Sequence, residues 1–336
     1  MKQVYINKIE HYLPLKKESN AQVLKMAGKN KYDIQKMINK IGIRTRRIVD
    51  KNIFSNDLAI RSAKKILKFI NPNDIDYLIF CTNTPDFLLP TNACILQDKL
   101  GLKKTIGAFD VILACSGYIY TLAIAKSLIV TGQAKNILLI TSDTYSKFIK
   151  KNDAKTRILF GDGSTSTLIS SKKKSNSFKI INFTYGTDGS GYKNAIINNF
   201  GSRHWLNRKK GGEFLDLNGP EIYDFALKRV PNAIDEFLKK NNLKLNKINH
   251  FVFHQANEFI IKSLQRKLKI PDNKIFFDMK NTGNTSSSSI PIVLSKNFYK
   301  ILSGKNILLI GFGGGLSWGV GLIKNADKKN LKNKTF

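Results

Sequence analysis

Uninterrupted apolar runs alternate with helical segments along this chain of 336 residues, and this alternation constrains the fold more than any other feature. Residues 76–81, 136–143 and 306–311 are mostly apolar at successive positions, which is typical of strands buried on both faces. Helical patterns with apolar faces occupy 118–130 and 258–268. The alternation predicts an α/β protein with a mostly parallel sheet covered by helices on both faces.

The order of strand, helix and strand occurs twice, which favours two structurally duplicated halves. We place the N-terminal half at 1–172 and the C-terminal half at 173–324, with the polar lysine- and serine-rich run 171–177 as the link. No short-period repeat is visible. The lysine- and asparagine-rich tail, 325–336, is expected to be disordered.

The individual elements follow from periodicity and from turn and cap signals. Asn56 is expected to cap an amphipathic helix, and Ser19-Asn20 a shorter one. Strands are expected at 3–12, 76–81, 136–143, 178–184, 250–253, 275–277, 306–311 and 319–323, and helices at 92–100, 118–130, 220–240, 258–268 and 286–302.

The net charge of +32 allows a nucleic acid, an anionic membrane or an acidic protein as a partner. Lysines are spread over the whole length, and no helix-turn-helix, zinc-finger or RNA-binding signature is present. A diffuse solvated surface is therefore favoured over a specific nucleic-acid site. An acidic protein partner is the best functional use of the charge.

Two further features bear on the compartment. No apolar run reaches 18 residues, so we expect no membrane span, and a strand pattern starts at the first residues without a signal peptide. Cys81, Cys94 and Cys115 form no CxxC pair and no even framework. A reducing cytoplasm fits this usage best.

Cys115 lies where a predicted strand becomes a predicted helix. The run 111–113 ends the strand, small residues flank the cysteine, and a largely buried helix follows at 118–130. The unpaired N–H groups and positive dipole end of a helix N-terminus favour a thiolate, which is the nucleophilic form. The alternative is that Cys115 is a small buried hydrophobic residue.

Three segments of the second half differ from ordinary structural sequence. His254-Gln255-Ala256-Asn257 follows a buried strand at the edge where parallel sheets bind ligands, whereas His11, His204 and His250 are interpreted as structural. In the segment 283–291, Asn284 could donate a hydrogen bond, and Thr285 or Ser286 could instead cap a helix. The glycines of 311–319 could expose N–H groups as an oxyanion hole, and a phosphate loop is the competing interpretation.

These segments, taken together and in order, resemble the β-ketoacyl-acyl carrier protein synthase III family of thiolase-fold condensing enzymes. The resemblance covers about residues 1 to 324, and it implies a five-layered αβαβα fold with two pseudo-duplicated halves and a homodimer. The motifs that carry it are Asp110 with Ala114-Cys115-Ser116-Gly117, Phe160-Gly161-Asp162-Gly163, His254-Gln255-Ala256-Asn257, Gly283-Asn284-Thr285-Ser286, and Gly313-Gly314-Gly315 with Trp318-Gly319.

The resemblance also implies the chemistry. Cys115 would accept an acyl group, His254 and Asn284 would complete the triad, and the N–H groups of Cys115 and Gly314 would form the oxyanion hole. A malonyl thioester on acyl carrier protein would then lose CO2 and condense with the acyl group, with no metal or redox cofactor. An acyltransferase that uses the same triad to load an oxygen or nitrogen acceptor remains the alternative.

Several positions depart from the family pattern around the substrate. Lys36 and Lys40 stand where the family has a tryptophan and an arginine that hold coenzyme A. Ala154 and Phe259 each stand where the family has an arginine. These departures predict altered handling of coenzyme A, so that the acyl donor arrives on a carrier protein.

The resemblance assigns three residues to the substrate pocket. Phe160 and Phe259 are expected to line it. Leu89, which precedes Pro90, takes the place of a phenylalanine that in the family often reaches into the pocket of the partner subunit.

Overall fold

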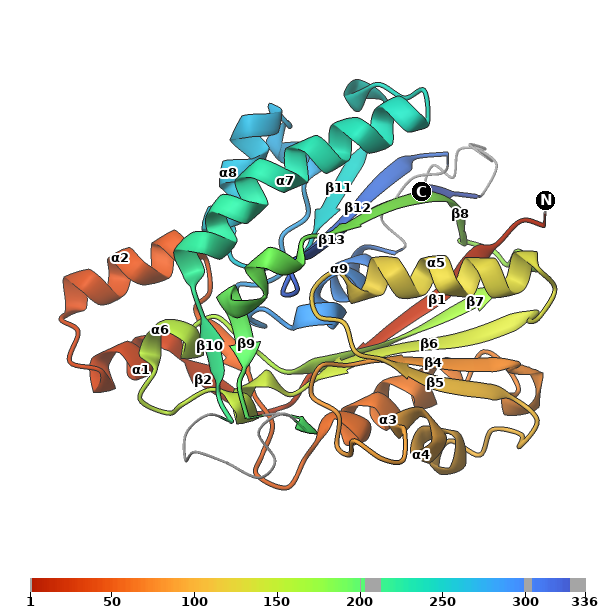
Figure 1. Ribbon diagram of the computed structural model, residues 1–336, viewed down its shortest axis with the longest axis horizontal. Helices are drawn as coiled ribbons and strands as arrows, with labels where there is room; N and C mark the ends of the chain where they lie inside the picture. Colours follow the sequence, from red (N-terminus) through yellow and green to blue (C-terminus); the bar gives the residue numbers. More distant parts are fainter. Residues whose placement is uncertain (1, 200, 203–212, 299–303, 327–336) are drawn as a thin grey trace, which may run out of the picture.

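The protein is described by a computed structural model over residues 2–199, 201–202, 213–298 and 304–326. Its main feature is a nine-stranded sheet in the order β11-β12-β13-β8-β1-β7-β6-β4-β5 (Figure 1). Two pairs of short strands, β2–β3 and β9–β10, form small separate sheets. The strands are β1 (Tyr5–Tyr12), β2 (Lys17–Ser19), β3 (Thr45–Arg47), β4 (Tyr77–Cys81), β5 (Gly107–Val111), β6 (Asn136–Asp143), β7 (Gly163–Ser170), β8 (Phe178–Thr187), β9 (Ala195–Ile197), β10 (Leu215–Leu217), β11 (His250–Phe253), β12 (Asn306–Gly313) and β13 (Ser317–Asn325).

The two ends of this sheet repeat one strand order. In the first half, β5-β4-β6-β7-β1 places the third, second, fourth, fifth and first strands side by side. In the second half, an isolated bridge joins Ile275 to Phe251 of β11, and β12, β13 and β8 follow in the same relative order. Only two residue pairs, Tyr5 with Lys179 and Ile6 with Phe178, join the halves through β1 and β8. The boundary between residues 172 and 173 stays a prediction.

The sheet is mixed, so the expectation of a mostly parallel sheet is wrong. Strand pairs β4–β5, β4–β6 and β11–β12 are parallel, and the other pairs of the large sheet are antiparallel. An apolar run in the sequence indicates that a strand is buried, but it does not show whether the strand runs parallel or antiparallel to its neighbours. The short connection between β12 and β13 permits only an antiparallel pair, because parallel strands need a long crossover.

Helices divide the molecule into the five expected layers (Figure 1). Helices α3 and α4 cover the outer face of the first half, and α7 and α8 cover that of the second. Helices α5 and α9 lie between the two halves of the sheet. The helices are α1 (Asn20–Met26), α2 (Lys31–Ile41), α3 (Ser55–Ile66), α4 (Asn92–Lys99), α5 (Gly117–Val130), α6 (Ala154–Arg157), α7 (Gly219–Lys240), α8 (Glu258–Leu268) and α9 (Ser289–Asn297).

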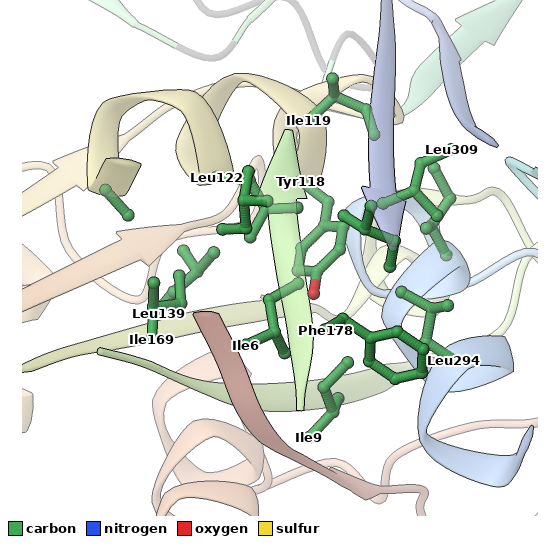
Figure 2. Close-up of a cluster of buried hydrophobic side chains, with 14 of the residues drawn as sticks. Ile6, Ile9, Tyr118, Ile119, Leu122, Leu139, Ile169, Phe178, Leu294 and Leu309 are labelled. Atoms are coloured by element: carbon green, nitrogen blue, oxygen red, sulfur yellow. The ribbon is translucent and has the colours of Figure 1, made fainter. Parts of the chain in front are cut away.

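The central helix α5 is held by a core that draws on both halves. Leu122 belongs to the same buried cluster as Ile6, Leu139 and Phe178, which come from three different strands (Figure 2). Glycines in β13 let the helix approach closely, because a Cβ atom at Gly319 would lie 2.9 Å from Cγ2 of Ile119. The N-terminus of α5 is therefore fixed relative to both halves of the sheet.

Some predicted boundaries differ from the structure. Helix α3 begins at Ser55 because the Asp57 carboxylate accepts the Phe54 N–H at 2.9 Å, while the Asn56 side chain donates to Asn92. The predicted strand at 275–277 is only the single bridge at Ile275. None of the helices within the described ranges is long and apolar enough to cross a bilayer. Most of the tail that we expected to be disordered, 327–336, lies outside the described residues.

Candidate active site

Cys115, His254 and Asn284 line one cavity of about 640 Å³. Cys115 follows β5 and precedes α5, His254 follows β11, and Asn284 precedes the 3-10 turn η7 (Ser286–Ser288) and α9. The walls are largely apolar, and their side chains come from both halves of the chain. They include Leu88, Ile112, Leu113, Tyr145, Leu159, Phe160, Ile196, Ile197, Leu215, Leu217, Ile222, Ile260 and Phe312.

The end of β12 is pressed against Cys115. A Cβ atom at Gly313 would lie 2.8 Å from Cβ and 3.0 Å from Sγ of Cys115, and one at Gly311 would lie 2.9 Å from Cα of Ser116. Real Cβ atoms do not tolerate such distances, so both positions need glycine. Two of the glycines noted in the sequence thus serve close packing around the cysteine.

The thiol of Cys115 is protonated in the unliganded site. Burial raises the pKa of Cys115 to about 12, with a smaller rise from the negative charge of Asp143, while a hydrogen bond with Ser286 acts in the opposite direction. The lowered pKa expected from the helix N-terminus is therefore outweighed by desolvation. Any attack by this sulfur requires a group that accepts its proton.

His254 is a neutral, firmly oriented imidazole. Its Nδ1 atom lies 2.7 Å from Oγ of Ser289 in α9, and its ring meets the edge of Phe312 at 5.6 Å between centroids. Burial lowers the pKa of His254 to about 3, and a backbone hydrogen bond at Ser286 offsets only part of this effect. The ring can therefore donate or accept one hydrogen bond in the cavity without carrying a charge at neutral pH.

The Asn284 amide has a fixed orientation. Its Oδ1 accepts the Ser286 N–H at 2.8 Å, so its NH2 group is left to donate toward the cavity that it lines. The backbone is anchored as well, because the Asn284 N–H donates to Leu159 at 2.8 Å and its carbonyl accepts from Gly161 at 2.9 Å. Asn284 thus links the first half of the chain to the turn before α9.

Two backbone amides face the same region as the cysteine. Cys115 and Gly314 both line the cavity. Within the described part of the chain, the Gly314 N–H donates to no protein acceptor, and the Cys115 N–H interacts only with the sulfur of its own side chain. The glycine loop is held to the start of α5 because Ser317 Oγ donates to the Gly314 carbonyl at 2.9 Å and lies 2.8 Å from Ser116 Oγ. Donors held in this way suit a developing oxyanion.

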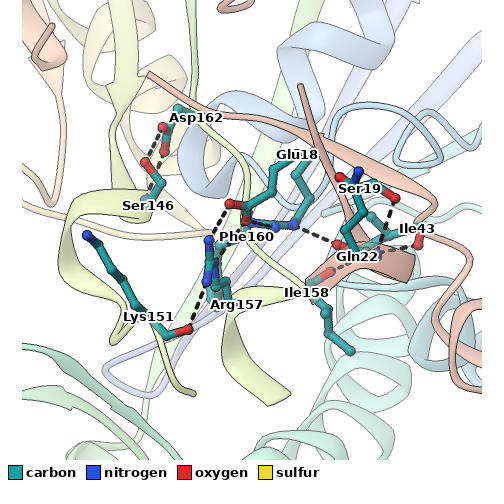
Figure 3. Close-up of polar contacts among 12 residues, drawn as sticks. Glu18, Ser19, Gln22, Ile43, Ser146, Lys151, Arg157, Ile158, Phe160 and Asp162 are labelled. Carbon is teal, nitrogen blue, oxygen red and sulfur yellow. Dashed lines mark hydrogen bonds and ion pairs between the residues drawn. The ribbon is translucent and has the colours of Figure 1, made fainter. Parts of the chain in front are cut away.

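Phe160 lines the cavity, and a largely buried ionic cluster supports its backbone (Figure 3). The Arg46 guanidinium is almost fully buried, donates to the Phe160 carbonyl at 3.3 Å and pairs with Glu18. Arg157 forms a second ion pair with Glu18. The two guanidinium groups hold the pKa of Glu18 below its usual range even though burial favours the neutral acid. Phe160 itself packs on Tyr145 at 5.1 Å between ring centroids.

The other two predicted pocket residues, Leu89 and Phe259, do not line this cavity. The Leu89 side chain is 87% exposed and points outward, whereas its neighbour Leu88 lines the wall. Phe259 lies between α7 and α2, stacked on Tyr223 at 5.1 Å with the Lys40 ammonium 4.5 Å from its ring centre. The placement of Leu89 in a partner's pocket stays a prediction.

The remaining departures from the family pattern lie around α2 and α6. Lys36 is exposed on α2, and Ala154 packs into a small core cluster beneath that helix. Within the described ranges, no group of three or more His, Cys, Asp or Glu side chains is placed to hold a metal ion.

The sequence did not identify four residues that lie close to the triad, namely Asp143, Tyr145, Ser286 and Ser289. Ser286 had been considered only as a helix cap or helix residue, and not as a neighbour of Cys115. The sequence could have indicated Asp143, because it is a polar residue at the end of a buried strand. His254 was selected for a similar position, directly after a buried strand. No local pattern could place Ser286 beside Cys115, since the two are 171 residues apart.

Two family models match segments of this chain. Residues 109–189 match the family model of 3-oxoacyl-[acyl-carrier-protein] synthase III, and residues 238–325 match the model of its C-terminal part. The matched segments contain Cys115, His254 and Asn284.

Similar proteins extend the match over nearly the whole chain. A β-ketoacyl-[acyl-carrier-protein] synthase III of Clostridium perfringens is 40% identical over 84% of this chain and 90% of its own. One of Clostridium tetani is 36% identical over 96% of this chain and 98% of its own. The crystal structure of 3-oxoacyl-[acyl-carrier-protein] synthase III of Aquifex aeolicus has a TM-score of 0.84 and 30% identity, and covers 96% of this chain and 99% of that one.

Proposed function

The chain belongs to the 3-oxoacyl-[acyl-carrier-protein] synthase III family, and on that premise we propose how its residues perform the reaction. The enzyme is an acyltransferase of the condensing type. It joins an acyl group, received from a thioester, to the two-carbon unit of malonyl-acyl carrier protein. The observation that carries the residue assignment is the single cavity that Cys115, His254 and Asn284 line together.

In the first half-reaction, Cys115 takes the acyl group. Its sulfur attacks the thioester carbonyl, the thiol proton leaves, and the carrier or coenzyme A departs as a thiol. The negative oxygen of the tetrahedral intermediate is stabilised by the N–H groups of Cys115 and Gly314. The large apolar wall of the cavity supports an acyl substituent beside the sulfur.

In the second half-reaction, malonyl thioester loses CO2 and its enolate attacks acyl-Cys115. The electrons of the broken C–C bond move toward the thioester oxygen, which needs hydrogen-bond donors rather than a strong base. The neutral imidazole of His254, through Nε2–H, and the Asn284 NH2 group supply these donors. The new C–C bond expels the Cys115 sulfur and gives a 3-oxoacyl thioester. The substrates are themselves activated thioesters, so no metal or redox cofactor is required.

The partners follow from the surface. An acidic acyl carrier protein fits the net charge of +32. A homodimer is supported by the exposed apolar side chains of Phe87, Leu88, Leu89 and Ile112, because soluble proteins seldom leave such a group uncovered. Three free cysteines support a reducing, cytoplasmic compartment.

Acyl loading tests the assignment of the nucleophile. The protein is incubated with acetyl, branched and medium-chain acyl thioesters, and its intact mass is followed with time. One acyl group per chain is expected, mapped by peptide analysis to Cys115 and absent from Cys115→Ala. Loading of the Ala variant, or acylation mapped to Cys81 or Cys94, would remove Cys115 from the mechanism.

A further inference from the structure

The role of His254 in the cavity depends on which of its two ring nitrogens carries the proton. A neutral imidazole has one N–H donor and one acceptor nitrogen. Burial lowers the pKa of His254 to about 3, so the ring is neutral at pH 7. Because Nδ1 is engaged by Ser289, Nε2 is the nitrogen left for the cavity that the ring lines. A residue that fixes the tautomer therefore decides whether this nitrogen is a donor or an acceptor.

Ser289, the first residue of α9, is the hydrogen-bond partner of Nδ1. Its Oγ atom lies 2.7 Å from Nδ1 of His254, and both residues are 2% exposed. The Gln255 N–H donates to the same hydroxyl oxygen at 3.3 Å. A backbone N–H can only donate, so the serine oxygen is the acceptor in that bond. The serine proton is therefore still available for a second partner.

The contacts of Ser289 leave one acceptor for this proton. Serine hydroxyls in helices often bond a carbonyl three or four residues earlier. Among the residues that the structure describes, the Ser289 hydroxyl forms no such bond, and its partners are the Gln255 N–H and Nδ1 of His254. The carbonyl of Ser286, three residues earlier, accepts the Ser289 N–H instead. The hydroxyl thus donates to Nδ1, which places the ring proton on Nε2.

His11 offers an internal comparison on the same helix. Its Nδ1 atom also lies 2.7 Å from a serine of α9, Oγ of Ser295. Unlike Ser289, however, Ser295 donates its proton to the Ile292 carbonyl at 2.8 Å. Burial lowers the pKa of His11 to about 4, so this ring is neutral at pH 7 as well, and its Nδ1 must be the donor. Two serine–histidine pairs of equal length therefore predict opposite tautomers.

We propose that Ser289 is a positioning residue that keeps the proton of His254 on Nε2, so that the imidazole donates to the malonyl thioester oxygen during decarboxylation. Ser289 acts through His254, since within the described ranges it does not itself line the cavity. The inference rests on the proposed function, because it supports the second half-reaction of that enzyme.

The ring proton stays on Nε2 throughout this step. As the bond between the malonyl carboxylate and its neighbouring carbon breaks, CO2 leaves and the bonding electrons move toward the thioester oxygen. His254 and Asn284 then donate hydrogen bonds to that oxygen.

The opposite tautomer would fail in two ways. Nε2 would present a lone pair where negative charge develops, which would leave the Asn284 amide as the single donor of the triad. Nδ1–H would also donate to the Ser289 oxygen, whose own proton would then have no acceptor among the described residues. A buried hydroxyl without an acceptor costs free energy.

Nuclear magnetic resonance of the protein labelled with 15N in histidine tests the tautomer directly. In two-bond 15N–1H correlation spectra at pH 7, a protonated ring nitrogen resonates far from an unprotonated one. Nε2 couples to both carbon-bound ring protons, whereas Nδ1 couples strongly to one, so the two nitrogens are told apart. His254→Asn and His11→Asn identify the signals. The proton is expected on Nε2 in His254 and on Nδ1 in His11.

Kinetics of the two half-reactions test the consequence. Outer partners that fix the tautomer of a metal-bound histidine are worth about 10- to 100-fold in activity, and Ser289→Ala should slow CO2 release and condensation by a similar factor. Acyl loading of Cys115 should stay close to the wild-type rate. Ser289→Thr keeps the hydroxyl and should recover most of the activity, with the proton on Nε2. Ser295→Ala, the matched control on α9, should change only the His11 signals.

The outcomes separate the tautomer from the proposed function. A wild-type His254 protonated on Nδ1, toward Ser289 or the Ser286 backbone, would overturn the proposal. Condensation at the wild-type rate in Ser289→Ala, or an equal loss in Ser295→Ala, would overturn it too. The wild-type spectrum needs no change at Ser289, so it decides even if Ser289→Ala does not fold. A wild-type protein that loads acyl groups but forms no 3-oxoacyl product would overturn the function instead.

Discussion

A Cβ atom on Gly313 would lie 2.8 Å from the Cβ atom of Cys115 and 3.0 Å from its Sγ atom. Gly313→Ala should therefore displace either the cysteine or the glycine loop. We expect acyl loading to slow at least about tenfold, with a loss of about 1–3 kcal/mol in the free energy of unfolding. Intact-mass kinetics and denaturant unfolding measure the two effects.

Gly189→Ala is the matched control for this substitution. A Cβ atom at Gly189 meets nothing within 4 Å, so this variant should load acyl groups at the wild-type rate. Wild-type loading by Gly313→Ala would show that the close packing at β12 does not position the nucleophile.

The buried neutral imidazole of His254 makes stability depend on pH. Its pKa is about 3 in the folded state and near 6.5 when unfolded, so the unfolded chain binds more protons between these values. The free energy of unfolding should therefore fall as pH drops below 6.5, by up to about 1.4 kcal/mol per pH unit from this residue. In His254→Asn, the free energy of unfolding should change less with pH between pH 4 and 6 than it does in the wild type. His11, whose pKa burial lowers to about 4, contributes in the same direction and remains in the variant. An unchanged slope would mean that His254 is not buried in its neutral form.

The position of Lys40 above the Phe259 ring bears on the acyl donor. A lysine engaged with a phenylalanine offers neither the stacking surface of a tryptophan nor the planar fork of an arginine for coenzyme A. Losing a stacking partner costs about 1–3 kcal/mol. We expect Cys115 to be acylated faster from acyl carrier protein than from coenzyme A, with an advantage that shrinks as salt rises.

Single-turnover rates at two salt concentrations measure this preference. Lys40→Ala should reduce the rate with the carrier-bound donor more than Lys68→Ala, a substitution at an exposed lysine that follows α3. Equal rates for the two donors, or faster loading from coenzyme A, would mean that other residues bind the nucleotide.

The exposed Leu89 leads to a prediction about assembly. If it enters the pocket of a second subunit, the protein is a dimer at micromolar concentration, and Leu89→Asp weakens that dimer and lowers the loading of acyl chains. Light scattering measures the mass, and Leu15→Asp, at an equally exposed leucine near the start of the chain, is the control. A wild-type monomer at micromolar concentration would refute the placement.

The hydrophobic periodicity of the sequence predicted many of the helices and strands, and polar residues at the ends of buried strands indicated candidate site residues. Strand β11 and helix α8 have the predicted bounds to the residue, and His254, placed from the sequence at a strand end, lines one cavity with Cys115 and Asn284. Ser286 was predicted to begin or cap a helix, whereas it has a left-handed φ of +50° and begins the 3-10 turn η7. The raised pKa of Cys115 was missed, since desolvation comes from the assembled tertiary structure.

Condensation by this chain should release one CO2 for each product formed, and the ratio of the two can be measured. Acyl-loaded enzyme is mixed with malonyl-acyl carrier protein carrying 13C in its free carboxyl group, and the released CO2 and the carrier-bound product are quantified in one sample. One labelled CO2 is expected for each 3-oxoacyl product in the wild type. His254→Ala and Asn284→Ala should still load Cys115 but release almost none. Consumption of the acyl group without labelled CO2, by transfer to an oxygen or nitrogen acceptor, would contradict the account.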